Sequence, residues 1–330
     1  MAKSIFAHAR ALAASAVVVL IASQAHALTE VKMITFGGAS VLPVWIAQDK
    51  GLFEKEGLKV IRETTRNSRE QIKNMFEGNY QFASTAFDNL VAYHNGTGAV
   101  QYENFDVVAI LGVHGGMNSV LATPEIKTWN DIRGKTLAVD AVRSGYATVL
   151  YQILQKHGIG PKDYKVIAVG NTGARVKAMK EGAAQMGIVS SPDDLQLQRE
   201  GFNILADTSQ EIGQYQGSSY AVKRAYIKSN PKETLAFARA IIAAHDVIHN
   251  DRATAYEVLR RHVKRLSDEQ VNAMLDRMRG PSGFFKKAEL SREGIENVFK
   301  LRAVYGGEKP VTDFSKYIDP TVAQRALTGK

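Results

Sequence analysis

The stretch Gly37–Val60, GGASVLPVWIAQDKGLFEKEGLKV, decides the fold of the first part of the chain. Before it, Val31–Phe36 (VKMITF) alternates and is rich in β-branched and aromatic residues, which predicts a strand. Small residues then form a tight loop, and a proline suits the first turn of a helix over Val44–Lys50. Gly51 can end this helix in a left-handed conformation, and Leu58–Glu63 returns as a second strand. The stretch is therefore predicted to be a βαβ unit.

Such a unit has a preferred place for a ligand. Ligands of open α/β sheets bind at the carboxyl ends of the strands, beside the N-terminus of the following helix. The unpaired N–H groups there favour an anion or a polar acceptor. This makes Ser40, in the small-residue loop, a candidate ligand-binding residue. An ordinary connection between a strand and a helix explains the same residues equally well, so both interpretations stay open at this point.

The segment LPVWIAQDKGLFEKEGLKV (residues 42–60) resembles the opening signature of periplasmic solute-binding proteins of ABC importers, in the nitrate/sulfonate/taurine/thiamine-pyrimidine group. Later segments repeat the likeness in the family's order: EGNYQFASTAFDNLV (77–91), GNTGARVKAMKEGAAQMGIVSSPDDLQLQREGF (170–202) and KSNPKETLAFARAII (228–242). Gln81 and Gln185 stand where the family has acidic residues. The resemblance implies an α/β, two-lobed periplasmic binding protein fold (type II-like) with two crossover hinges. It also implies a small-molecule solute between the lobes and an ABC permease of the inner membrane as partner.

The N-terminus predicts the compartment. Lys3 and Arg10 precede an apolar run over Ala11–Ala22, and Ala25–Ala27 has the small-x-small form of a signal-peptidase site. The run is shorter than the roughly 20 apolar residues that a membrane-spanning helix needs. We therefore predict a signal peptide over residues 1–27, cleaved after Ala27, and a mature periplasmic protein that begins at Leu28.

Composition excludes several classes of protein. The chain has no cysteine, so disulfides, thiolate metal sites and cysteine nucleophiles are excluded. Removal of the two basic residues of the predicted signal peptide would lower the formal net charge of +9 to +7. The basic residues are dispersed among acids rather than clustered with aromatics, so we expect no nucleic-acid partner and a mild preference for anionic solutes. We also expect a monomer.

The rhythm of strands and helices predicts how the chain divides. Residues 28–118 and 222–330 are expected to form lobe 1, and residues 119–221 lobe 2, with crossovers near Ser119–Thr123 and Ser218–Val222. Beyond the second crossover the pattern is helical. Because this tail has no strands with which to build a third unit, we expect it to pack on lobe 1.

The candidate binding residues follow predicted strands or begin predicted helices. Arg143, beside the start of a helix that Ser144 can cap, is the strongest anion-binding candidate, although a capping serine and a solvated arginine explain the pattern equally well. Trp45, Phe87 and Tyr146 can supply an apolar wall, but core packing explains each of them as well. The full predicted set is Ser40, Trp45, Thr85, Phe87, Arg143, Ser144, Gly145, Tyr146 and Ser190.

Catalytic and metal sites find little support in the sequence. No G-x-S-x-G, H-E-x-x-H or G-x-x-x-x-G-K-[ST] run occurs. His245 and His249 lie one helical turn apart but lack a third metal ligand, and His114 is typical of a loop histidine. We therefore expect no enzyme activity, no cofactor and no metal. A secreted hydrolase or lyase on the same scaffold and a binder of a pyrimidine or thiamine precursor remain the alternatives.

Overall fold

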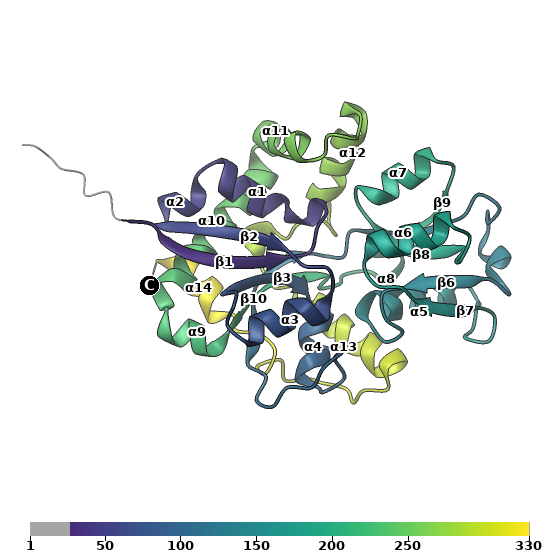
Figure 1. Cartoon of the computed structure of the whole chain (residues 1–330), viewed down its shortest axis with the longest axis horizontal. Helices are drawn as coiled ribbons and strands as arrows, with labels where there is room; N and C mark the ends of the chain where they lie inside the picture. Colours follow the sequence, from purple (N-terminus) through teal and green to yellow (C-terminus); the bar gives the residue numbers. More distant parts are fainter. Residues whose placement is uncertain (1–26, 330) are drawn as a thin grey trace, which may run out of the picture.

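The computed structural model describes residues 27–329 and shows two α/β lobes side by side (Figure 1). The predicted signal peptide therefore lies almost wholly outside the described residues. Within residues 27–329, no helix is both long enough and apolar enough to cross a membrane. The predicted fold class, two α/β lobes, is confirmed.

The first lobe is built on a mixed sheet with the strand order β2-β1-β3-β10-β4. β1 is parallel to β2 and to β3, whereas β10 is antiparallel to β3 and β4. The predicted βαβ unit opens this lobe, because Pro43 lies in the first turn of helix α1 and Gly51 takes a left-handed conformation (φ 63°) just after it. The strands are β1 (Thr29–Thr35), β2 (Leu58–Thr64), β3 (Phe82–Ala86), β4 (Val107–His114) and β10 (Ser218–Lys223).

The second lobe repeats this plan with the strand order β7-β6-β8-β5-β9. β6 is parallel to β7 and β8, and β5 is antiparallel to β8 and β9. A shared contact supports the correspondence: the side-chain carbonyl of Gln81 accepts from the N–H of Lys32 in β1, and that of Gln185 accepts from the N–H of Thr136 in β6. The strands are β5 (Asn118–Ala122), β6 (Thr136–Val139), β7 (Lys165–Ala168), β8 (Met186–Ser190) and β9 (Asn203–Asp207).

Helices surround both sheets (Figure 1). In chain order they are α1 (Leu42–Asp49), α2 (Leu52–Lys55), α3 (Ser68–Phe76), α4 (Phe87–His94), α5 (Gly145–Lys156), α6 (Thr172–Lys180), α7 (Asp193–Arg199), α8 (Thr208–Ile212), α9 (Arg224–Ser229), α10 (Pro231–Asn250), α11 (Arg252–His262), α12 (Asp268–Arg279), α13 (Arg292–Gly306) and α14 (Thr321–Thr328). Short 3-10 turns occupy Ala39–Val41, Trp129–Ile132 and Lys286–Ala288.

The chain passes between the lobes slightly earlier than the sequence suggested. Asn118 already pairs in the second sheet, and Ser218 already pairs in the first, so the passages lie at residues 115–117 and 213–217. The segments Ser119–Thr123 and Ser218–Val222 are therefore almost entirely strand. The predicted boundary at residue 222 is corrected to the start of β10, because that strand pairs with β3 and β4 along its whole length.

The C-terminal helices do not all pack on the first lobe. α10 packs against α1, α2 and α14, and the rings of Phe82 and Phe237 stack with centroids 3.9 Å apart. In contrast, α13 packs against α5 of the second lobe as well as α4 of the first. Its buried residues Val298 and Phe299 belong to the same apolar cluster as Leu150 of α5. The tail thus bridges the lobes, because α13 buries its apolar face between them.

Candidate functional site

A cavity of about 360 Å³ lies where the two lobes meet. This is within the range of roughly 300–1,000 Å³ typical of small-molecule sites. Its wall comes from loops after β1, β3, β6 and β8, from both interlobe passages and from α12. The lining includes Phe36, Ser40, Asp88, Tyr93, His114, Met117, Asn118, Asp140, Arg143, Ser144, Gly145, Tyr146, Arg175, Ser190, Tyr215, Ser218, Met274 and Arg277.

The lobes touch across the cavity. The N–H of Ala39 in the first lobe donates to the carbonyl of Ser191 in the second, at 3.3 Å. The side-chain amide of Asn171 in the second lobe donates to the carbonyl of Arg66 in the first, at 3.0 Å. The two lobes are therefore in direct contact beside the cavity, in a closed arrangement.

Six of the nine predicted site residues line this cavity: Ser40, Arg143, Ser144, Gly145, Tyr146 and Ser190. Ser144 caps α5 as expected, since its hydroxyl oxygen accepts from the N–H of Ala147 at 3.2 Å. The same hydroxyl donates to the carboxylate of Asp140. Arg143 is exposed at the rim, so its charge is largely solvated.

Trp45, Thr85 and Phe87 lie away from the cavity lining, and the predicted aromatic wall is corrected accordingly. The ring of Trp45 stacks on His262 of α11, with centroids 4.3 Å apart. Phe87 is fully buried and packs edge-on against Phe299 of α13. Thr85 is buried in β3, where its hydroxyl oxygen accepts from the side chain of a residue on α4. All three side chains therefore contact helices instead of lining the cavity. For Trp45 and Phe87 this agrees with core packing, the alternative explanation of the aromatic residues.

Asp88 is the most important site residue that the sequence did not reveal. Its position after a strand suggests a helix cap, but α4 begins at Phe87, and Asp88 lies in its first turn without capping it. Its carboxylate pairs with Arg302 of α13, with Oδ1 and Nη1 2.6 Å apart, and it lies against the start of α5, where a Cβ added to Gly145 would be 2.7 Å from Cγ of Asp88. Burial raises the pKa of Asp88, while Arg302 and the Gly145 N–H oppose this rise by stabilising the charged form.

Arg175 is a buried cation in the wall of the cavity. Its guanidinium donates to the carbonyls of Ile188 and Gly170 and to the hydroxyl of Thr172. No ion pair joins it to a carboxylate in the described part of the chain, and Asp140 is the main charge that acts on it. Burial lowers the pKa of Arg175, and Asp140 opposes this change. The sequence shows only an arginine one turn into a helix, which is typical of a surface position.

The inner end of the cavity, at the first interlobe passage, holds uncharged polar groups. The hydroxyl of Ser190 donates to Oδ1 of Asn118 at 2.6 Å. Nδ2 of Asn118 is buried near the Tyr146 hydroxyl, but no hydrogen bond of good geometry joins it to a described residue. Nδ1 of His114 accepts from the N–H of Gly116, so the ring proton is on Nε2. Burial lowers the pKa of His114 to about 4, and the charge of Arg277 adds to this effect.

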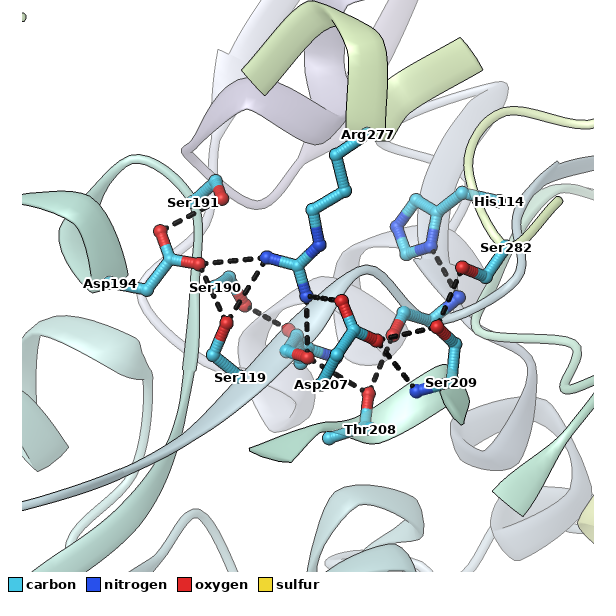
Figure 2. A network of polar contacts seen from close by, with 12 residues as sticks. His114, Ser119, Ser190, Ser191, Asp194, Asp207, Thr208, Ser209, Arg277 and Ser282 are labelled. Atoms are coloured by element: carbon cyan, nitrogen blue, oxygen red, sulfur yellow. Dashed lines mark hydrogen bonds and ion pairs between the residues drawn. The ribbon is translucent and has the colours of Figure 1, made fainter. Parts of the chain in front are cut away.

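Arg277 anchors α12 to the second lobe beside the cavity. Figure 2 shows its guanidinium between Asp194 and Asp207. The nitrogen–oxygen distances are 2.9 Å to Asp194 and 2.7 Å to Asp207. It also donates to the carbonyl of Asn118 and the hydroxyl of Ser119. Two carboxylates therefore face one cation.

Comparison with solved structures defines the class of fold. The nitrate-binding protein NrtA of Synechocystis PCC 6803 matches with a TM-score of 0.74 and 15% identity, over 92% of this chain and 89% of its own. The alkanesulfonate-binding protein SsuA of Xanthomonas axonopodis pv. citri, bound to MOPS, gives 0.69 and 16% over 89% and 97%. A ligand-binding component of an ABC-type import system from Staphylococcus aureus gives 0.76 and 12% over 90% and 99%. The chain has the fold of periplasmic binding proteins.

The sequence comparison then gives the family. The chain belongs to the family described as NMT1/THI5 like, whose profile matches residues 39–255. YtlA of Bacillus subtilis (strain 168), which is provisionally named a binding protein, is 23% identical over 213 residues. This match covers 64% of the chain and 63% of YtlA, so the chain spans less than two thirds of that relative's length.

Proposed function

We propose that this protein is the extracytoplasmic solute-binding component of an ABC importer. The observation that carries the proposal is the cavity of about 360 Å³ enclosed between two lobes that the chain joins by two passages. The ligands named for the structural relatives, nitrate and alkanesulfonates, support binding of a small solute. The protein then delivers the solute to a permease in the inner membrane.

The solute binds between the lobes and stabilises the closed arrangement. Ser40, Ser144 and Ser190 offer hydroxyl groups, Gly145 brings backbone close to the cavity, and the ring of Tyr146 forms part of the wall. Arg143, exposed at the rim, acts on entering solutes more than on bound ones. Rotation about residues 115–117 and 213–217 opens the cavity, since a few residues between elements can absorb such a motion.

A thermal-shift screen of small polar solutes tests this proposal. A solute present at a hundred times its dissociation constant should stabilise the protein by about 2.7 kcal/mol. Calorimetry of each hit should show saturable binding near one solute per chain, and small-angle scattering should show a smaller radius of gyration at saturation. Turnover of a hit by the purified protein would instead favour the secreted hydrolase or lyase.

The cellular compartment is also part of the proposal. We propose that a signal peptide is removed after Ala27 and that the mature protein is a periplasmic monomer. The periplasmic origin stated for NrtA and related structures supports this location. N-terminal sequencing of the exported protein should begin at Leu28, and an intact Met1 would contradict the proposal.

A further inference from the structure

Arg175 of α6 lies where two neighbouring strands of the second sheet part. β6 and β8 run parallel, and their pairing ends at Ala138 and Gly187. The chain leaves β6 for β7 on one side and returns to β8 on the other, so the strand order reverses between β6 and β8. Ligands of open α/β sheets bind in the crevice at such a switch point. The Nε–H of Arg175 donates to the carbonyl of Ile188 in β8 at 2.8 Å, which places the guanidinium there, in the wall of the cavity.

The guanidinium of Arg175 keeps donors for a solute. Nη1 donates to the carbonyl of Gly170 at 2.8 Å, and Nη2 donates to the hydroxyl of Thr172 at 3.0 Å. Each terminal nitrogen of a guanidinium carries two N–H groups. Among residues 27–329, one N–H on Nη1 and one on Nη2 therefore have no protein acceptor. Both nitrogens belong to one planar group, which matches the two oxygens of a carboxylate.

The charge of Arg175 is buried without an ion pair. The residue is 4% exposed, whereas Arg143 of the same lining is exposed to solvent and Arg277 pairs with two carboxylates. Asp140 is the acid whose charge acts most on Arg175, but its carboxylate accepts from the hydroxyl of Ser144 and forms no ion pair with the guanidinium. A buried cation without a counter-ion destabilises a protein. A solute carboxylate at Arg175 would supply this counter-ion.

A second donor lies on the same edge of the sheet. Asn118 is 2% exposed, and its Oδ1 accepts from the Ser190 hydroxyl at 2.6 Å, so Nδ2 is the end that can donate. This nitrogen is buried and has no hydrogen-bond partner among the described residues. Asn118 pairs with Ser190 across β5 and β8, and Ser190 lies two residues beyond Ile188, which Arg175 contacts. A buried donor without an acceptor is unfavourable, so an acceptor atom of a solute would be stabilised here.

We propose that Arg175 is the anion-binding residue of the cavity and that the solute is a small carboxylate. The two carboxylate oxygens accept from Nη1 and Nη2, and a further acceptor of the solute faces Nδ2 of Asn118. A sulfonate fits less well, because its third oxygen needs another donor. The sequence pointed to Arg143 for this role. The inference rests on the proposed function and names its class of solute.

Simple anions test the inference without knowledge of the natural solute. Acetate, butyrate and benzoate are titrated calorimetrically against the wild-type protein, with ethanesulfonate for comparison and chloride as the matched salt. We expect saturable binding of at least one carboxylate, near one per chain and at least tenfold tighter than that of ethanesulfonate. Saturable binding of none of the three carboxylates, or equal affinity for ethanesulfonate, would overturn the inference.

Variants of Arg175 and a crystal structure assign the binding to this residue. Arg175→Lys keeps the charge but loses the planar pair of donors, and should weaken carboxylate binding at least tenfold. Arg133→Gln is the control: it removes an arginine of the same lobe that is 47% exposed and paired with Asp163, and the affinity should stay within twofold. Unchanged affinity of Arg175→Lys would overturn the inference. A crystal structure of the wild-type protein with the bound carboxylate needs no variant, and a carboxylate beyond hydrogen-bonding distance of Nη1 and Nη2 would also overturn it.

Failure of the inference can be told from failure of the proposed function. A protein that binds a carboxylate at Arg175, but turns it over as an enzyme would, retains the carboxylate site and loses the proposed function. A protein that closes around an uncharged solute of the screen, yet binds none of the carboxylates, retains the proposed function and loses the inference.

Discussion

Replacing Arg277 with methionine should destabilise the protein strongly, because Arg277 is the cation that ties α12 to the second lobe. Its guanidinium contacts Asp194 and Asp207 (Figure 2). It also donates to the Asn118 carbonyl at 2.7 Å. Methionine keeps much of the aliphatic stem but removes the charge and all of these bonds. The carboxylate of Asp194, only 1% exposed, would remain without a cation.

The size of the loss in unfolding free energy depends on the hydrogen bonds that Asp194 retains. Breaking a buried ion pair by removing one partner costs roughly 3–5 kcal/mol. Asp194 still accepts from the hydroxyls of Ser119 and Ser191 and from the N–H of Leu195, which favours the lower end of this range. We therefore expect the free energy of unfolding to fall by about 3 kcal/mol, with a melting temperature lower by roughly 6–12 °C.

Urea unfolding followed by tryptophan fluorescence measures this change lobe by lobe. The chain has two tryptophans, Trp45 on α1 of the first lobe and Trp129 in a 3-10 turn of the second. Variants that keep one tryptophan each report on a single lobe. The matched control is Arg292→Met, which removes an arginine that is 81% exposed and paired one helical turn away, and should cost under about 0.5 kcal/mol.

A second substitution separates the charge from the packing. Adding Asp194→Asn to Arg277→Met removes the stranded carboxylate and should recover at least about 1 kcal/mol. A loss below about 1 kcal/mol for Arg277→Met, or one equal to that of the Arg292→Met control, would refute the reasoning. Equal losses with and without Asp194→Asn would show that packing, not charge, connects α12 to the second lobe.

Two further changes are predicted from single sites. Gly145→Ala should push Asp88 aside, cost about 1–3 kcal/mol and enlarge the radius of gyration in small-angle scattering. Gly160→Ala, whose added Cβ would lie 3.7 Å from the carboxylate of Asp163, should change stability by less than about 0.5 kcal/mol, and equal behaviour of the two variants would contradict this prediction. Burial lowers the pKa of His245 from 6.5 to about 3, so the unfolded chain binds more protons than the native protein between these values, and stability falls as the pH drops through this window. His245→Gln should reduce the slope of unfolding free energy against pH by about 1.4 kcal/mol per unit near pH 5, and an unchanged slope would count against the assignment.

The local part of the fold could be predicted because short-range rules determine it. Pro43 near the start of α1, Gly51 with φ 63° and the Ser144 cap of α5 all act within a few residues of their own position. The alternation of residue types in β1 and the small residues after it are also local features, and they predicted the strand and the loop. These features place Ser40 and Ser144 at the carboxyl edges of the two sheets, where the cavity lies.

The contacts between distant parts of the chain could not be predicted, because no local sequence pattern indicates them. Asp88 and Arg302 are 214 residues apart in the sequence, and Arg277 and Asp194 are 83 apart. Asp88 follows a strand and precedes an apolar helix, which is also the pattern of a helix cap. The packing of α13 between the lobes places Arg302 beside Asp88 and buries the Asp88 carboxylate.

The same residues explain why net charge is a poor guide to the solute of this protein. The chain carries a formal charge of +9, but the charge that a bound solute meets depends on which acids the fold brings beside the buried arginines. Asp88, from the first lobe, lies against Gly145 of the second lobe, so it contributes to the contact between the lobes. Changing this carboxylate should therefore shift the closing of the lobes. Affinities measured for variants of Asp88 need scattering data beside them, because a weaker closed state lowers the affinity for every solute alike.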